Sequence, residues 1–211
     1  MTALRWSRDV PLEGLVLRQA TPADAQDLAA LMAEPAVEQW WHQAWETEKW
    51  AAYIAGLVQN PDSLPLTLAE DAPGGQAVGY VEVYRVATDI LGRHAAHSAT
   101  DLGMHLALGE LARGRGLGAR LIRSILDAAP GILEGCGRLV AEPDTRNTRS
   151  HRAFEAAGFA AAGTVQLPDK RALLVVAAPG AVPIQDAGSI EETESIQETV
   201  STHDANQGAL L

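Results

Sequence analysis

Residues Asp101–Leu121 read DLGMHLALGELARGRGLGARL. The first eight form a mostly apolar run with one histidine, His105, and predict a β-strand. A glycine-rich basic turn follows, and an amphipathic helix begins behind it. This order builds an anion site, because glycines let the backbone approach a ligand and the N–H groups at a helix start point outward. Arg113 and Arg115 add guanidinium donors suited to phosphate.

Two nucleotide-binding motifs are alternatives for this turn. Gly114-x-Gly116-x-x-Ala119 fits a relaxed dinucleotide fingerprint. A dinucleotide fold places that pattern after the first strand of a repeated parallel β-α-β series, whereas here three consecutive strands precede it. A phosphate-binding P-loop needs Gly-Lys-Ser/Thr at its end, and the chain has none there. We therefore expect a different anion-binding turn, Arg113-x-x-Gly116-x-Gly118.

The rest of the hydrophobic pattern predicts an α+β fold. We expect strands at 14–21, 64–69, 78–86, 101–108, 138–141, 163–167 and 172–177, and helices at 22–34, 37–59, 116–126 and 147–157. The helix at 37–59 is expected to break near 45–47, and Pro130 and Gly131 are expected to end the helix that starts at 116. The expected sheet is central and flanked by helices on both faces.

Composition divides the 211 residues into an N-terminal extension (1–13), one domain (14–178) and an acidic tail (179–211). The tail has six acidic residues, no Lys or Arg and no periodicity, so we expect disorder. It accounts for −6 of the net charge of −11, which leaves −5 for the rest. A mildly acidic domain argues against a nucleic-acid partner and is compatible with a cationic or amine substrate.

Other classes of protein are disfavoured by what the sequence lacks. No apolar run approaches the roughly 18 residues of a membrane span, so no membrane partner is expected. The N-terminus lacks the apolar core of a signal peptide, and Cys136 is a single cysteine, so we expect a cytoplasmic protein without internal disulfides. His94 and His97 have no cysteine or acidic partner at ligand spacing, so we expect no metal.

A second motif lies at the predicted helix 147–157. It reads Asn147-Thr-Arg-Ser150-His-Arg-Ala-Phe154, followed by Gly158-Phe159. Together with the Arg113–Gly118 turn, this motif resembles two signatures of the GNAT N-acetyltransferase superfamily, over about residues 15–176. The resemblance implies the GNAT fold, with a mostly antiparallel twisted sheet, and acyl-CoA as co-substrate, either acetyl-CoA or succinyl-CoA.

The same resemblance assigns coenzyme contacts. It implies that backbone amides across the turn hold the coenzyme A pyrophosphate, that Asn147 contacts the pantetheine or phosphate arm, and that strand amides near Leu106 and Leu108 polarise the thioester carbonyl. The residues of the turn are Arg113, Gly114, Arg115, Gly116, Leu117 and Gly118. The family often has a tyrosine that protonates the leaving thiolate where this chain has Phe154. Either another group acts, or the thiolate leaves without help.

His105 and Asp144 are the candidate catalytic residues. Small residues on either side of His105 leave a hollow beside its ring, and a histidine there can act as a base near neutral pH. A structural histidine bound to a carbonyl is an equal alternative. Asp144 follows the next strand and can orient a histidine, although it can equally cap the following helix. Gly103-Met-His105 and Glu142-Pro-Asp144 resemble siderophore-biosynthesis acyltransferases, in which this His and Asp are the proposed catalytic pair.

Four residues are candidates for substrate binding. Trp41 and Trp45 are spaced i, i+4 and would share a helical face, where they could form a wall for an acyl chain or an aliphatic amine. Glu82 and Tyr84 point together from the predicted strand 78–86, where Glu82 could bind a cationic end. Core packing of the tryptophans and a solvated strand face are the alternatives.

The resemblance implies acyl transfer to an amine or N-hydroxylated amine of the hydroxyornithine, hydroxylysine or hydroxycadaverine type in hydroxamate siderophore biosynthesis. The aminoglycoside 6′-N-acetyltransferases share Trp40-Trp41 and Gly79-Tyr80, so an aminoglycoside or other small amine is the alternative acceptor. A catalytically silent domain that binds acyl-CoA is the third possibility. The partners expected are therefore coenzyme A and a small amine, for a monomer or a homodimer.

Overall fold

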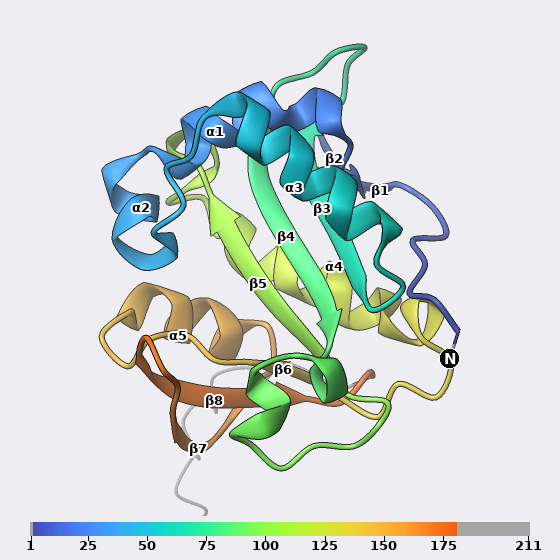
Figure 1. Ribbon diagram of the computed structural model, residues 1–211, viewed down its shortest axis with the longest axis vertical. Helices are drawn as coiled ribbons and strands as arrows, with labels where there is room; N and C mark the ends of the chain where they lie inside the picture. Colours follow the sequence, from blue (N-terminus) through green and yellow to red (C-terminus); the bar gives the residue numbers. More distant parts are fainter. Residues whose placement is uncertain (1, 181–211) are drawn as a thin grey trace, which may run out of the picture.

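The computed structural model describes residues 2–180 and contains one eight-stranded mixed sheet (Figure 1). Its strands are β1 (Val10–Leu12), β2 (Leu15–Gln19), β3 (Ser63–Glu70), β4 (Ala77–Arg85), β5 (Leu102–Leu108), β6 (Leu139–Ala141), β7 (Ala160–Gln166) and β8 (Arg171–Ala177). Their order across the sheet is β1-β2-β3-β4-β5-β6-β8-β7, and every pair except β5–β6 is antiparallel. The predicted α+β class with a mostly antiparallel sheet is confirmed.

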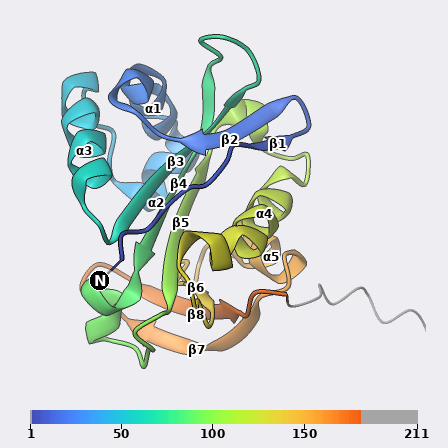
Figure 2. The same cartoon turned by 90° about the vertical axis from the view of Figure 1, so that its right-hand side faces the viewer.

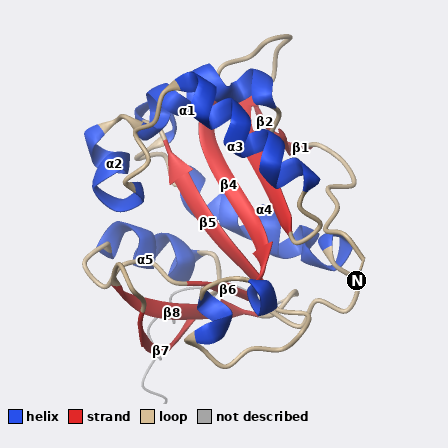
Figure 3. Ribbon diagram, in the orientation of Figure 1, coloured by secondary structure: helices blue, strands red, loops and turns tan. Residues whose placement is uncertain are grey.

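Five α-helices cover the two faces of the sheet (Figures 2 and 3). They are α1 (Ala25–Met32), α2 (Pro35–Trp41), α3 (Thr47–Gln59), α4 (Leu117–Ile132) and α5 (Thr148–Ala156). The first three bury their apolar sides in one core on one face, with Tyr80 and Ala107. Helices α4 and α5 pack into a separate core on the opposite face, where Leu102 and Met104 of β5 lie. Strand β5 therefore contributes to both cores through its alternating side chains.

The sheet splits between β5 and β6. These strands pair only at Leu102–Leu139 and Gly103–Val140. Beyond Gly103, the residues from 104 to 108 have no paired strand on the β6 side, and β5 and β8 diverge in Figure 1. The backbone groups of this half of β5 are therefore available to something other than a strand.

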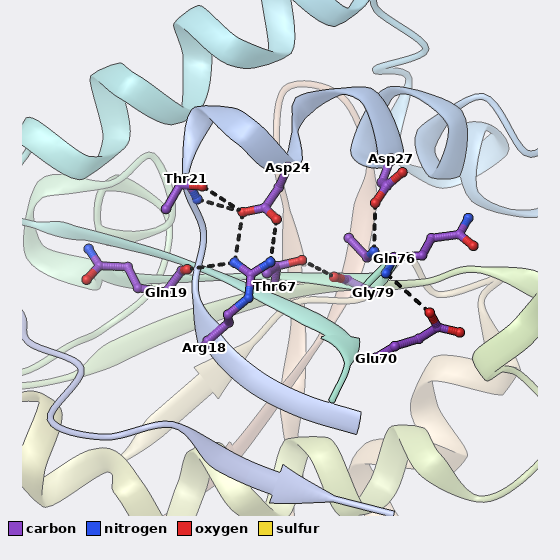
Figure 4. A network of polar contacts seen from close by, with 10 residues as sticks. Arg18, Gln19, Thr21, Asp24, Asp27, Thr67, Glu70, Gln76 and Gly79 are labelled. Atoms are coloured by element: carbon purple, nitrogen blue, oxygen red, sulfur yellow. Dashed lines mark hydrogen bonds and ion pairs between the residues drawn. The ribbon is translucent and has the colours of Figure 1, made fainter. Parts of the chain in front are cut away.

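A network of polar contacts holds the start of α1 against the sheet (Figure 4). Arg18 of β2 forms an ion pair of 2.6 Å with Asp24, and Asp24 accepts a bond from the Thr21 backbone N–H. Asp27 accepts a bond of 2.8 Å from the backbone N–H of Ala77 on β4. The network fixes the start of α1 relative to β2 and β4.

Three features of the fold differ from the prediction. Residues 10–12 form the edge strand β1 and Leu4 is buried, so the expected extension 1–13 packs onto the domain. Helix α2 ends earlier than expected because His42 adopts a left-handed conformation with φ of 53°. Helix α4 continues through Pro130 to Ile132, because burial of Ala129 and Ile132 stabilises its last turn.

The expected disorder of the tail concerns residues 179–211, and all but the first two of these lie outside the described residues. Within residues 2–180, every helix is too short or too polar to cross a lipid bilayer.

Candidate active site

Two cavities meet at the split between β5 and β6. The first, which we call the histidine cavity, has a volume of about 340 Å³ and is lined by His105, Glu82 and Glu142 among others. The second, the glycine groove, has about 660 Å³ and is lined by the turn after β5 and by α5. Seven residues line both cavities at their junction: Gln39, Trp40, Trp41, Leu106, Arg146, Asn147 and Ser150. A long ligand in the groove can therefore present its end to the histidine cavity.

The position of His105 is determined by β5 and its neighbours. His105 is opposite Glu82 of β4 in the antiparallel register, and about a third of its side chain is exposed. Its ring lies 4.7 Å from the Tyr84 ring and 6.1 Å edge-on from the Trp41 ring, measured between centroids. Gly103 makes room for this packing, because a Cβ there would overlap the Tyr84 ring. Sterics thus explain the glycine two residues before His105.

Glu142 is the carboxylate that contacts His105. Its Oε1 lies 2.6 Å from Nε2 of His105, and its Oε2 accepts a bond of 3.1 Å from the Tyr84 hydroxyl. Nζ of Lys170 is 3.6 Å from Oε1. Because an ionised carboxylate only accepts hydrogen bonds, Nε2 is the donor and Nδ1 carries the lone pair of the neutral ring.

The pKa values of this pair move apart. Burial by itself raises the pKa of Glu142, but the charge and hydrogen bond of His105, with Lys170 and Tyr84, hold it at about 2. Burial lowers the pKa of His105, but the charge and hydrogen bond of Glu142 outweigh it, and Glu82 adds to them. The pKa of His105 is therefore raised above its ordinary value of 6.5. Glu142 is therefore ionised across the neutral range, and its charge makes His105 a stronger base than a free imidazole.

Asp144 does not make the expected contact with His105. It lines the same cavity, but both of its oxygens bind the Arg146 guanidinium, at 2.8 and 2.7 Å. The hydrogen bond from Arg146 lowers the pKa of Asp144 to about 2. The guanidinium carbon in turn lies 5.8 Å from the centre of the Trp40 ring. Asp144 therefore positions Arg146 at the junction of the two cavities.

The four predicted substrate-binding residues separate into two pairs. Glu82 and Trp41 line the histidine cavity, and Glu82 accepts bonds from the hydroxyls of Tyr53 and Tyr80 at 3.0 and 3.4 Å. Tyr84 is buried beneath His105 and lines neither cavity. Trp45 also lines neither, because α2 ends at Trp41 and the expected shared helical face with Trp41 does not exist. It packs against Trp50 and Tyr53 instead.

The predicted turn forms one wall of the glycine groove. Gly114 and Gly116 adopt positive φ angles of 80° and 70°, and α4 begins at Leu117. Eight of the nine predicted coenzyme residues line the groove: Leu106, Leu108, Arg113, Gly114, Gly116, Leu117, Gly118 and Asn147. Arg115 does not line it. The helix start therefore offers backbone N–H donors to an anion in the groove.

The Arg113 guanidinium is already occupied. It forms an ion pair of 2.8 Å with Glu34 and donates a bond of 3.2 Å to the carbonyl of Leu108. Glu34 also accepts bonds from the backbone N–H of Glu110. Arg113 thus ties the turn to the start of α2, where Glu34 is the N-cap residue, a structural contact that the sequence spacing did not indicate.

Phe154 is buried against Phe159 and borders the histidine cavity. Ser150 lies one helical turn earlier on α5 and lines both cavities, so a hydroxyl is present at their junction.

Within residues 2–180, no group of three His, Cys, Asp or Glu side chains is arranged to hold a metal ion.

Sequence reasoning missed Glu142 as the partner of His105. The pairing follows from the register of two neighbouring parallel strands, which no local sequence signal marks. Leu102 pairs with Leu139 and Gly103 with Val140, so the same offset places Glu142 beside His105. Glu142 belongs to the same Glu-Pro-Asp motif, but the resemblance to siderophore-biosynthesis acyltransferases assigned the catalytic carboxylate to Asp144, two residues later.

Comparisons with known proteins agree on one family. A family model described as Acetyltransferase (GNAT) domain matches residues 20–167. The lysine N-acyltransferase MbtK of Mycolicibacterium paratuberculosis is 32% identical over 165 residues, covering 77% of this chain and 73% of that protein. The N(6)-hydroxylysine O-acetyltransferase of Escherichia coli is 32% identical over 169 residues, covering 77% of this chain and 51% of that protein.

Solved structures share the fold. An uncharacterized protein from Bacillus halodurans superposes with a TM-score of 0.72 at 26% identity, covering 81% of this chain and 89% of that one. The aminoglycoside acetyltransferase AAC(6′)-Ib, in a complex with paromomycin and acetyl-CoA, has a TM-score of 0.68 at 22% identity, covering 79% and 94%. With the family match, the sheet split and the glycine groove, these findings identify the chain as a member of the GNAT acetyltransferase family and an acyl-CoA-dependent N-acyltransferase.

Proposed function

We propose that this protein transfers an acetyl or succinyl group from acyl-CoA to an amine or N-hydroxylated amine in hydroxamate siderophore biosynthesis. The acceptor is of the hydroxylysine, hydroxyornithine or hydroxycadaverine type. The observation that carries this proposal is the His105–Glu142 pair, which opens into a cavity at the end of the glycine groove. Two relatives, each 32% identical to this chain, are named as a lysine N-acyltransferase and an N(6)-hydroxylysine O-acetyltransferase.

The proposed reaction is direct attack in a ternary complex. The acceptor nitrogen attacks the thioester carbon, and Nδ1 of His105 takes the proton that the nitrogen loses. Glu142 holds the Nε2–H of the ring and stabilises the imidazolium that forms. The carbon–sulfur bond then breaks and the sulfur keeps its electron pair. Backbone amides between Leu106 and Leu108 polarise the carbonyl, and the Ser150 hydroxyl at the junction can donate to the leaving sulfur.

The charge of the histidine cavity fits a cationic acceptor. Glu82 and Asp89 line it, and neither has an ion pair within residues 2–180. A hydroxylamine nitrogen is less basic than an alkyl amine, so more of it is neutral at pH 7. That chemistry suits a histidine base.

A cytoplasmic location is part of the proposal, because a single unpaired cysteine fits a reducing compartment.

The decisive experiment replaces the base. His105→Ala should lower turnover by about 10²–10⁴ while coenzyme A still binds, because the groove residues are unchanged. His94→Ala is the matched control, since His94 is exposed and lines neither cavity. Steady-state thiol release and equilibrium coenzyme binding are the measurements. Unchanged turnover in His105→Ala would remove His105 from the mechanism.

A second acceptor class follows from the same acidic cavity. An aminoglycoside is a polycation, and AAC(6′)-Ib shares the fold. Assays of kanamycin beside N-hydroxyornithine, N-hydroxylysine and N-hydroxycadaverine separate the two. Preference for kanamycin would favour the aminoglycoside alternative, and thiol release with none of the four would favour a silent acyl-CoA-binding domain.

A further inference from the structure

The glycine groove has an unusual charge for this protein. The chain carries a net charge of −11, yet no acidic side chain of the described residues lines the groove. Four arginines line it: Arg113, Arg146, Arg149 and Arg152. Positive charge is thus concentrated where a polyanionic coenzyme lies.

Only two of these arginines are uncommitted. Arg113 is paired with Glu34, and Arg146 is held by both oxygens of Asp144. The side chains of Arg149 and Arg152 are exposed and make no ion pair or hydrogen bond with another residue of the described part of the chain. The sequence predicted that arginines of the glycine turn would contact phosphate. In the structure, the guanidinium groups that are free to do so in the groove belong to α5.

These two arginines lie beside the glycine turn. They are spaced i, i+3 on α5, so they follow one helix face about 4.5 Å apart along the axis. Ala153, next to Arg152, packs against the start of α4, where a Cβ built on Gly118 would lie 3.7 Å from the Ala153 Cβ. An anion held by the helix start at Leu117 would thus have the arginine pair on its α5 side.

We propose that Arg149 and Arg152 bind the 3′-phosphate on the adenosine ribose of the coenzyme. The pyrophosphate can use the backbone N–H groups of the turn and the dipole of α4. A phosphate monoester that projects from the ribose lies beyond those donors and requires side-chain cations, for which a guanidinium fork is suited. The assignment rests on the coenzyme part of the proposed function and is independent of the acceptor.

The test compares coenzyme A with 3′-dephospho-coenzyme A in equilibrium binding to the full chain, without any acceptor. Arg149→Ala combined with Arg152→Ala should weaken coenzyme A binding about tenfold or more and leave 3′-dephospho-coenzyme A binding nearly unchanged. Alanine is a good helix former, so α5 should persist, and a denaturant curve verifies this. Arg5→Ala combined with Arg8→Ala is the matched control, because it removes two charges outside both cavities.

The expected result is that discrimination between the two ligands disappears in the α5 double variant and persists in the control. Equal weakening of both ligands would overturn the assignment, because the arginines would then act on a phosphate that both share. Unchanged binding of both would overturn it too. A wrong acceptor affects none of these readings, whereas failure of the unaltered protein to bind either ligand would contradict coenzyme use itself.

Discussion

The Glu142 carboxylate controls both the position and the proton affinity of the His105 ring. Glu142→Gln keeps a hydrogen-bond acceptor at 2.6 Å but removes the charge that raises the pKa of His105. The lower-pH limb of the kcat/KM profile should therefore move to lower pH, because the base becomes neutral earlier. Plateau turnover should fall by about tenfold or more, a part of the roughly 10²–10⁴ that a general base contributes.

The measurement is a pH–rate profile of both proteins under saturating acyl-CoA. Asp144→Asn is the informative comparison, since Asp144 binds Arg146 and does not contact His105. If Asp144→Asn moves the limb and Glu142→Gln does not, the assignment of the positioning carboxylate is wrong.

At the scale of single residues, the sequence predicted which residues line the site better than it predicted their contacts. His105 was predicted from the small residues on either side of it, and the acidic segment after β6 from its place at the end of the next strand. The pairing of His105 with Glu142 depends on a parallel register across 37 residues of chain. The ion pair of Arg113 with Glu34 depends on where the start of α2 lies relative to the turn. Neither contact leaves a local signal, because both join residues distant in sequence.

At the scale of elements, Gly103 of β5 leaves no room for a methyl group. Gly103→Ala would overlap the Tyr84 ring, which cannot move easily because it is buried and bound to Glu142. The free energy of unfolding should fall by about 1–3 kcal/mol, and turnover should fall as well because His105 stacks on Tyr84.

Gly56→Ala is the matched control for this substitution, measured by denaturant unfolding. Gly56 lies in α3 with no atom within 4 Å of the position of a Cβ, so alanine should stabilise the helix by up to about 1 kcal/mol. Equal stability of Gly103→Ala and the unaltered protein would show that β4 and β5 adjust without strain.

The elements themselves were largely predictable because most present a regular hydrophobic pattern to one of three buried clusters. The exceptions arise where tertiary contacts override local preference. A left-handed non-glycine residue ends α2 at His42, and no composition signal marks it. Proline in α4 is tolerated because the residues around it are buried. The edge strand β1 has only three residues, too few for a periodic signal.

At the scale of the whole molecule, the coenzyme groove joins the two parts of the split sheet, with α2 and β5 on one side and α5 on the other. Coenzyme A should therefore stabilise the native state. At 100 times its dissociation constant, the gain is about 2.7 kcal/mol. For a chain of this size that raises Tm by roughly 5–11 °C.

Thermal unfolding with and without coenzyme A measures this gain. His105→Ala should show the same increase, because His105 does not line the groove. An increase that depended on His105 would place part of the coenzyme in the histidine cavity.

The gap beside β5 also has a consequence for what the protein admits. An unpaired strand edge ordinarily invites strands of other proteins, which is a route to aggregation. Here that edge is recessed between α2 and α5, whose residues line the groove with Leu106 and Leu108. A strand of another protein would meet these helix residues before it reached β5. A linear arm that carries amide groups can instead pair with the main-chain groups that β6 leaves unpaired beyond Gly103.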